Sequence, residues 1–209
     1  MNNHIDHILW ATPDFEEGVA MMHELSGVRP DYGGPHPGLG TQNALLALGS
    51  RVYLEILGPD SKQNLEGTFG GTIAALGKPG ILTLAARTQD IQAAAARARD
   101  AGLTAAEPMA MTRRTEDGRV LQWRVMLLKD EEYGWSIPFF IDWGDAPHPA
   151  DTAAPGCQLV SCKIMHPNGA RLSRILGALD IPIAVTKSET AGFVAELNTP
   201  KGRLNLTGS

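Results

Sequence analysis

Residues 51–60, RVYLEILGPD, have the composition of a buried strand with one charged residue in its middle. The run is aliphatic, β-branched and aromatic, and Gly58-Pro59-Asp60 is a stop signal. Glu55 interrupts it, and a carboxylate inside an apolar strand costs several kcal/mol unless another group compensates its charge. We therefore expect Glu55 to have a polar partner elsewhere in the chain.

A repeated order of elements indicates where that partner lies. Residues 5–11 alternate as a strand, Thr12-Pro13-Asp14 begins a helix that closes at Gly27, and three further strands lead to residue 60. The same β-α-β-β-β order recurs from residue 80 and again from residue 159. The polar residue in the strand 51–60 therefore belongs to a module that occurs three times.

Alignment of the copies pairs polar residues of the first and fourth strands. The fourth strands, YLEILG, FIDWG and RLNLTG, align at Glu55, Asp142 and Asn205, and the first strands, aligned through their helix starts, at His7, Thr83 and Ser161. Alternate residues of a strand share a face, so His7 and Glu55 are predicted to meet on one face of a sheet.

Five stretches together resemble the glyoxalase-like domain proteins of the vicinal oxygen chelate superfamily, which includes glyoxalase I, bleomycin resistance proteins and extradiol dioxygenases. They are IDHILWATPD, GGPHPGLGTQNALLALG, YLEILGPD, RRTEDGRVLQW and PFFIDWGDAPHP, and the resemblance covers about residues 4 to 206. It implies an α+β fold of tandem βαβββ modules, forming a cup-shaped mixed sheet with helices packed outside.

We expect two domains from this arrangement. Residues 1–150 would hold the paired modules of the cup, at 1–60 and 80–145, and residues 156–209 a third, degenerate βαβββ module. The Gly-rich segment 61–78 and the Ala/Pro-rich segment 145–155 are interpreted as linkers.

The resemblance also implies a divalent metal held by first-strand and fourth-strand side chains. Thr83 occupies the place of the second first-strand ligand and is a poor ligand for zinc or iron(II), which leaves His7, Glu55 and Asp142 as the predicted set. This set would suit Zn, Fe(II), Mn or Mg, and Glu55 could double as a catalytic base. Asp142 has an alternative role as the ion-pair partner of Arg114 or Arg124.

Further residues are predicted to bind a small organic substrate with an apolar body and a carboxylate or vicinal oxygens. His36, in the Gly- and Pro-rich stretch GGPHPG at 33–38, is either a solvated loop residue or a cavity residue and fourth ligand. His148 and His166, before prolines, are interpreted as structural. The predicted substrate-binding residues are His36, Asn43, Tyr53, Arg114, Trp123 and Phe140.

Three classes of function follow from these features. The first is a metal-dependent lyase, isomerase or dioxygenase of the vicinal oxygen chelate type. The second is a metal-free protein that binds or sequesters a small molecule in the same cup, and the third is an inactive scaffold with a filled cup. Stoichiometric metal would separate the first from the second.

Charge and hydropathy narrow the range of partners. The net charge of −5 gives no electrostatic case for nucleic acid or an anionic membrane. No run reaches the ~18 apolar residues of a membrane helix, and no signal peptide is evident, so we expect a cytoplasmic protein. The third module lacks a partner within the chain, which predicts a homodimer, with a monomer in which it folds back on the cup as the alternative.

Overall fold

The computed structural model describes residues 3–114 and 120–208, with side chains for all of these except 113 and 114. Its strands and helices follow the repeated order that the sequence predicts. In chain order they are β1 His4–Ala11, α1 Phe15–Ser26, β2 Asp31–His36, β3 Thr41–Ala47, β4 Tyr53–Pro59, α2 Phe69–Ala74, β5 Gly80–Arg87, α3 Ile91–Asp100, β6 Thr104–Ala105, β7 Met109–Arg114, β8 Val120–Met126, β9 Leu128–Lys129, the 3-10 helix η1 Gly134–Ser136, β10 Phe139–Asp142, the 3-10 helix η2 Pro149–Asp151, β11 Gln158–His166, α4 Gly169–Ala178, β12 Ala184–Lys187, β13 Gly192–Thr199 and β14 Gly202–Gly208.

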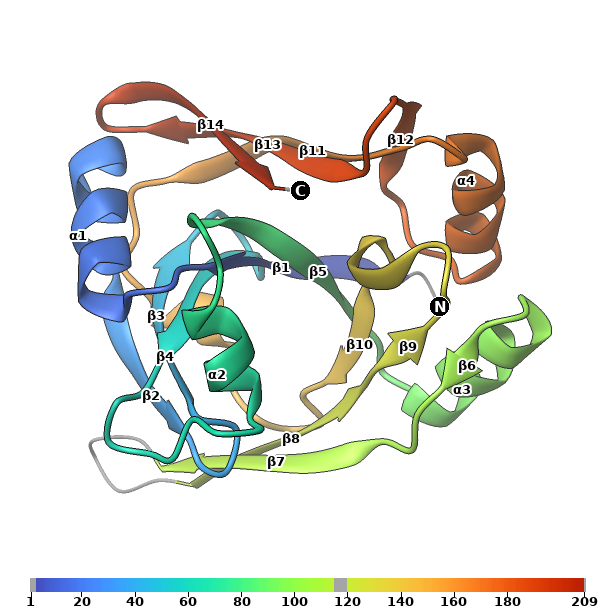
Figure 1. Ribbon diagram of the computed structural model, residues 1–209, viewed down its shortest axis with the longest axis horizontal. Coiled ribbons are helices and arrows are strands. Elements are labelled where there is room, and N and C mark those ends of the chain that lie inside the picture. The colour runs from blue at the N-terminus through green and yellow to red at the C-terminus, as the bar shows by residue number, and fades with distance from the viewer. Residues whose placement is uncertain (1–2, 115–119, 209) are drawn as a thin grey trace.

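The main sheet has eight strands in the order β2-β3-β4-β1-β5-β10-β8-β7. In each half the first strand lies parallel to the fourth, β1 beside β4 and β5 beside β10, and the antiparallel pair β1–β5 joins the halves. The sheet is strongly curled, so that its two edges approach each other (Figure 1). The prediction of an α+β fold in which tandem βαβββ modules form a cup-shaped mixed sheet is therefore confirmed.

Helices α1 and α3 cover the convex face of this sheet (Figure 1). Helix α1 begins just after the expected start at Thr12, because its N-cap is Asp14, whose side chain accepts a hydrogen bond from the Glu17 N–H. It ends, as expected, at Gly27, which is in the left-handed conformation with φ 79°. Met22 of α1 and Ala94 of α3 are buried in the same hydrophobic cluster as Ile8 of β1. The side chains on the convex face of the strands thus form the core with the helices, and those on the concave face line the cup.

The third copy keeps the order of elements but has a different strand order, β12-β11-β13-β14. Its first strand, β11, pairs with β12 and β13, and its fourth strand, β14, pairs with β13 at the edge. The expected equivalence of Ser161 and Asn205 with His7 and Glu55 is therefore wrong. Strands β12 and β13 flank β11, so β14, which carries Asn205, does not lie next to the strand that carries Ser161. Its core joins that of the main sheet, since Leu206 and Ile81 belong to one cluster. The division into two domains stays a prediction.

Both expected linkers carry short helices. Segment 61–78 contains α2, whose first turn is capped by the Thr68 hydroxyl, which accepts a hydrogen bond from the Gly71 N–H. Segment 145–155 contains η2. Within the described part of the chain, no helix is long and apolar enough to cross a membrane.

Candidate functional site

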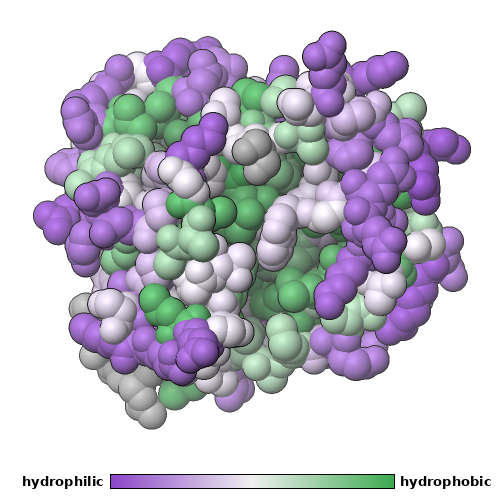
Figure 2. Space-filling view, viewed as in Figure 1, coloured by the Kyte–Doolittle hydropathy of each residue, from purple (hydrophilic) through white to green (hydrophobic). Residues whose placement is uncertain are grey.

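The concave face of the main sheet encloses a cavity of about 300 Å³. The space-filling view shows a central hollow in which hydrophobic residues gather, bordered by hydrophilic residues on the outer surface (Figure 2). Its apolar and aromatic lining includes Leu9, Leu39, Leu45, Tyr53, Leu57, Phe69, Met109, Met111, Trp123, Val125, Leu127, Trp135, Phe139, Ile141 and Trp143. Its polar lining is small and consists of His7, His36, Thr41, Asn43, Glu55 and Thr83.

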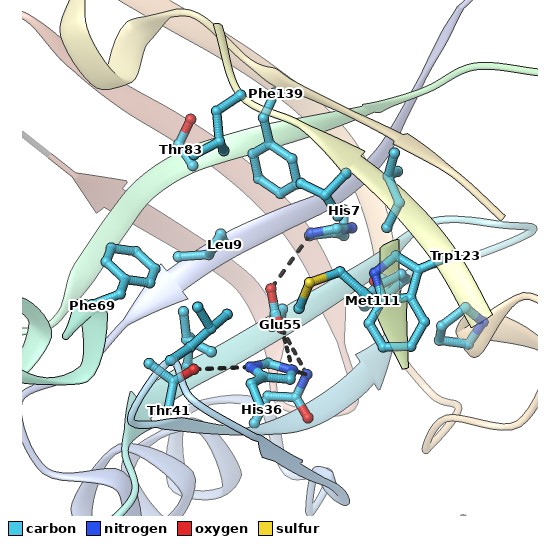
Figure 3. A pocket seen from close by; sticks show the side chains of 18 of the residues that line it. His7, Leu9, His36, Thr41, Glu55, Phe69, Thr83, Met111, Trp123 and Phe139 are labelled. Atoms are coloured by element: carbon cyan, nitrogen blue, oxygen red, sulfur yellow. Dashed lines mark hydrogen bonds and ion pairs between the residues drawn. The ribbon is translucent and has the colours of Figure 1, made fainter. Parts of the chain in front are cut away.

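Glu55 is the carboxylate of this cavity, on β4 and 7% exposed. Asn43 Nδ2 donates a hydrogen bond of 2.6 Å to Glu55 Oε1, and His7 Nε2 lies 3.5 Å from Glu55 Oε2. Figure 3 shows the contact between His7 and Glu55 across the floor of the cup. The structure therefore brings together the two residues that the repeat alignment pairs.

The hairpin β2–β3 brings a second imidazole to the same carboxylate. His36 and Thr41 pair across the hairpin, where His36 Nδ1 lies 3.0 Å from Thr41 Oγ1. His36 Nε2 lies 3.2 Å from Asn43 Nδ2 and 4.0 Å from Glu55 Oε1. Of the two interpretations of His36, solvated loop residue or cavity residue, the structure supports the cavity (Figure 3).

Aromatic rings make up the walls beside this polar group. The Tyr53 ring stacks on His7 with 4.6 Å between centroids and an interplanar angle of 25°. Trp123 packs 5.3 Å from Trp143, and Phe69 of α2 stacks on Trp135 of η1 at 5.7 Å. Tyr53 and Trp123 therefore lie in the cavity wall, where the sequence analysis predicts substrate contacts.

Two predicted site residues, Phe140 and Asp142, lie outside the cavity. Phe140 is fully buried in the core beneath α3, whereas its neighbours Phe139 and Ile141 line the cup. Asp142 borders a different pocket and accepts a 2.5 Å hydrogen bond from Arg124, one of its two proposed alternative partners. The predicted face of β10 is therefore wrong by one residue, which moves both side chains away from the cup.

The other expected substrate contact, Arg114, ends β7, and its side chain lies outside the described residues.

The His7, Glu55 and Asp142 metal site is not assembled. Asp142 instead pairs with Arg124. The strand registers also place Phe139, not Asp142, in the position equivalent to Glu55. Glu55 lies opposite Leu9 of β1, and Phe139 lies opposite the corresponding residue of β5, Ala85. The Thr83 hydroxyl donates to the Trp135 carbonyl oxygen at 2.8 Å. Among the described residues, no group of three His, Cys, Asp or Glu side chains could hold a metal ion. The residues present therefore do not fit the four-ligand site that the superfamily implies.

We expect the protein to contain no stoichiometric metal, because only one imidazole and one carboxylate remain at the positions that the superfamily uses as ligands. Elemental analysis of protein purified without chelator, then dialysed against Mn²⁺, Fe²⁺ or Zn²⁺ and freed of excess ion, measures this directly. One equivalent of metal that the His7→Ala variant loses would contradict the expectation.

Several residues that line the cavity were not predicted from the sequence, and the reason can be identified for each. Phe69 and Trp135 come from α2 and η1, short helices in segments without a periodic pattern. Met109 and Met111 alternate on β7 and could have been found from that alternation. Asp6 and His148 lie behind the wall, in contact with His7 or with each other.

Comparison with known proteins agrees with this architecture. A family model described as a glyoxalase-like domain matches residues 5–179. A search of curated proteins gives no match. A hypothetical protein from Staphylococcus aureus has a similar solved structure, with a TM-score of 0.68, 18% identity, and coverage of 98% of this chain and 85% of that one.

Methylmalonyl-CoA epimerases are also similar in structure. That of Streptomyces coelicolor, in complex with 2-nitronate-propionyl-CoA, has a TM-score of 0.52 and 21% identity and covers 71% of this chain and 100% of its own. That of Mycobacterium tuberculosis has a TM-score of 0.50 and 23% identity and covers 71% and 91%. At these identities the likeness concerns the fold alone.

Proposed function

This chain belongs to the glyoxalase-like domain family of the vicinal oxygen chelate superfamily, and from that premise we propose that it is an enzyme in which Glu55 is the general base. The proposed substrate is a small, mainly apolar organic molecule with a carbonyl group, and the proposed reaction is proton transfer at the neighbouring carbon, as in an isomerase or lyase. The observation that carries this proposal is one buried carboxylate, beside a small group of polar side chains, in the wall of a mainly apolar cavity.

The surroundings of Glu55 suit a base. The hydrogen bond from Asn43 Nδ2 holds the carboxylate in the wall, within reach of a ligand in the cup. An apolar cavity excludes water, which strengthens electrostatic interactions inside it and protects a carbanion-like intermediate from side reactions. A general base placed in this way contributes about 10²–10⁴-fold to a rate.

The other polar groups supply the complementary half of the chemistry. In the proposed step, Glu55 takes the proton from carbon, and negative charge develops on the substrate's carbonyl oxygen. A ring N–H of His36, which borders the cavity beside Glu55, is assigned to that oxygen, whereas the Asn43 amide is directed at Glu55 and His36. Protonated Glu55 then returns the proton to a different carbon of the intermediate, which completes an isomerisation, whereas its return to the same carbon gives only exchange with solvent.

The size and lining of the cup limit the substrate. A cavity of about 300 Å³ is at the lower end of the range for small-molecule sites. The rings of Tyr53, Trp123 and Trp143 favour a flat apolar body. Proton transfer is a type of reaction that this fold is able to host, since the similar structures include methylmalonyl-CoA epimerases.

Solvent exchange tests the proposal with any carbonyl compound that enters the cup. A panel of aryl ketones and aryl 2-oxo acids, such as phenylacetone and phenylpyruvate, is incubated with the protein in D₂O. For those compounds that bind, we expect the protein to accelerate the loss of the ¹H NMR signal of the protons on the carbon next to the carbonyl, because Glu55 exchanges its proton with solvent. Binding without any acceleration across the panel would contradict enzymatic proton transfer.

Sequestration of a small molecule is the second candidate, and the predominantly apolar lining favours it. Three tryptophans, Trp123, Trp135 and Trp143, line the cavity, so ligand binding is measurable as a change in tryptophan fluorescence. Saturable binding that Glu55→Gln leaves unchanged, together with no proton exchange, would support sequestration instead of catalysis.

A further inference from the structure

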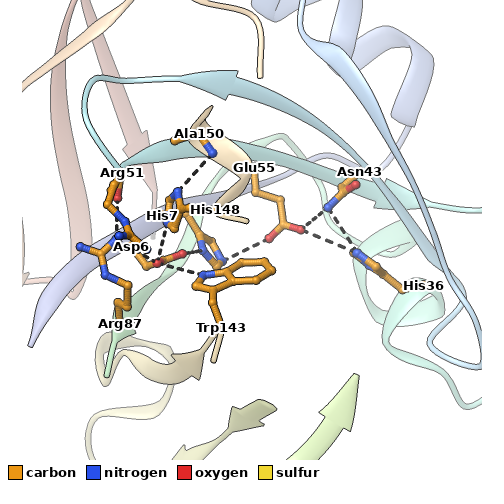
Figure 4. Close-up of polar contacts among 10 residues, drawn as sticks. All are labelled: Asp6, His7, His36, Asn43, Arg51, Glu55, Arg87, Trp143, His148 and Ala150. Carbon is orange, nitrogen blue, oxygen red and sulfur yellow. Dashed lines mark hydrogen bonds and ion pairs between the residues drawn. The ribbon is translucent and has the colours of Figure 1, made fainter. Parts of the chain in front are cut away.

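Behind His7 lies a buried polar network centred on Asp6, which itself does not line the cavity. Asp6 is 0% exposed, and its Oδ1 lies 2.8 Å from His7 Nδ1. Its Oδ2 lies 2.9 Å from His148 Nε2, and it accepts a 3.1 Å hydrogen bond from Trp143 Nε1. Arg87 Nη1 lies 3.6 Å from the same oxygen. Figure 4 shows these groups gathered around Asp6, with His7 between Asp6 and Glu55.

The backbone of β1 is irregular at this point. The pairing of β1 with β5 shifts register between Ile5 and His7, so that Asp6 has no partner in the ladder. In a regular strand, Asp6 and His7 would point to opposite faces. A bulge re-aims a side chain, and here it allows the Asp6 carboxylate to reach the His7 ring.

The proton positions in the network follow from its contacts. The Ala150 N–H donates to His148 Nδ1 at 3.2 Å, so the proton of a neutral His148 ring lies on Nε2 and points at Asp6. Burial would raise the pKa of Asp6, but hydrogen bonds from His148 and His7 hold it below its ordinary value, so Asp6 is an anion. The His7 Nδ1 atom therefore carries a proton, which leaves Nε2 to face Glu55.

We propose that Asp6 and His148 are positioning residues: the segment after β10 inserts His148 behind β1 to hold Asp6, and Asp6 fixes the ring of His7 with Nε2 towards Glu55. Neither residue lines the cavity, so each acts through His7. This inference rests on the proposed function where it concerns catalysis. The orientation and tautomer of His7 can be tested independently of any reaction.

The opposing explanation is that His148 only fastens the segment 145–155 to the sheet, and a second histidine provides the control. His166 is also buried, also precedes a proline, and also accepts a backbone hydrogen bond at Nδ1, from the Asn168 N–H at 3.1 Å. It lies on β11, away from the cup, and packs against Tyr133. His166→Leu therefore removes an equivalent local contact without touching the His7 network.

The experiment records long-range ¹H–¹⁵N spectra of ¹⁵N-histidine-labelled protein, together with the proton exchange rate on phenylacetone. We expect Asp6→Asn to move the His7 proton from Nδ1 to Nε2, where it would hydrogen-bond the Glu55 carboxylate and weaken it as a base, and so to lower the exchange rate about 10–100-fold. His148→Leu should shift the His7 ring signals and lower the rate about 10–100-fold. His148→Gln, whose amide offers an N–H in the place of Nε2, should restore both.

The outcomes separate the two explanations. The control His166→Leu is expected to leave the His7 ring signals unchanged. If Asp6→Asn and His148→Leu also leave them unchanged, the network is only a structural fastening and the proposal is overturned. If the wild-type protein exchanges no protons, the proposed function fails, but the His7 spectra still decide whether Asp6 and His148 position its ring.

Discussion

Glu55→Gln is expected to lower the rate of proton exchange on a bound aryl ketone by about 10²–10⁴-fold while leaving the fold intact, because an amide cannot accept a proton from carbon. Glutamine has nearly the same shape, and its carbonyl oxygen can accept the hydrogen bond that Asn43 now donates to Glu55. The apolar walls do not change, so the dissociation constant measured by tryptophan fluorescence should change much less than the rate.

Asp142→Asn is the matched control for this prediction. Asp142 is also a buried carboxylate near the end of a strand of the main sheet, but it contacts Arg124 and lies outside the cup. The proton exchange rate of Asp142→Asn should stay near that of the wild type. Equal losses in Glu55→Gln and Asp142→Asn would contradict a specific role for Glu55, since they would show a general sensitivity to removal of sheet carboxylates.

Asp6→Ala is expected to have the largest effect on stability, a loss of about 3–5 kcal/mol in the free energy of unfolding, because it breaks a buried charged network by removing one partner. The substitution leaves the N–H groups of His148 and Trp143 buried without their acceptor. Urea denaturation followed by tryptophan fluorescence measures the loss. Glu196→Ala removes a partially exposed carboxylate that pairs with Arg203 and should cost about 1 kcal/mol or less.

The same network predicts how stability depends on pH. Hydrogen bonds from His148 and His7 place the pKa of folded Asp6 below that of the unfolded chain, which is about 3.9. Asp6 therefore adds stability that is fully present above the unfolded pKa and is lost as the pH falls below it. The free energy of unfolding should therefore fall less steeply with decreasing pH in Asp6→Asn than in the wild type. An equally steep fall in the two proteins would show that Asp6 contributes nothing to the pH dependence.

The sequence predicts the cup well because its evidence is periodic. A polar residue in an apolar strand, repeated once per module, locates Glu55, and strand alternation pairs it with His7. Loop composition gives weaker information: the glycines around His36 allow a solvated loop or a hairpin equally well, and only the pairing of β2 with β3 decides.

The errors arise where periodicity is short or broken. Strand β10 has four residues, and two consecutive phenylalanines fit either face, so the alternation places Phe140 and Asp142 on the wrong one. The bulge that brings Asp6 beside His7 leaves no trace in the alternation of β1. The strand order of β11 to β14 depends on pairing and not on the order along the chain. The homodimer expected from this third copy stays a prediction.

The proton exchange rate of chelator-treated protein tests the central claim, that Glu55 performs acid–base chemistry in the cup without the four-ligand metal site of the superfamily. The protein is treated with EDTA and dialysed, and exchange on phenylacetone in D₂O is followed by ¹H NMR beside Glu55→Gln and Asp142→Asn. We predict that the treated wild type and Asp142→Asn keep their rate and that Glu55→Gln loses it. A rate that disappears with EDTA and returns with one equivalent of Zn²⁺, Mn²⁺ or Fe²⁺ would contradict this account.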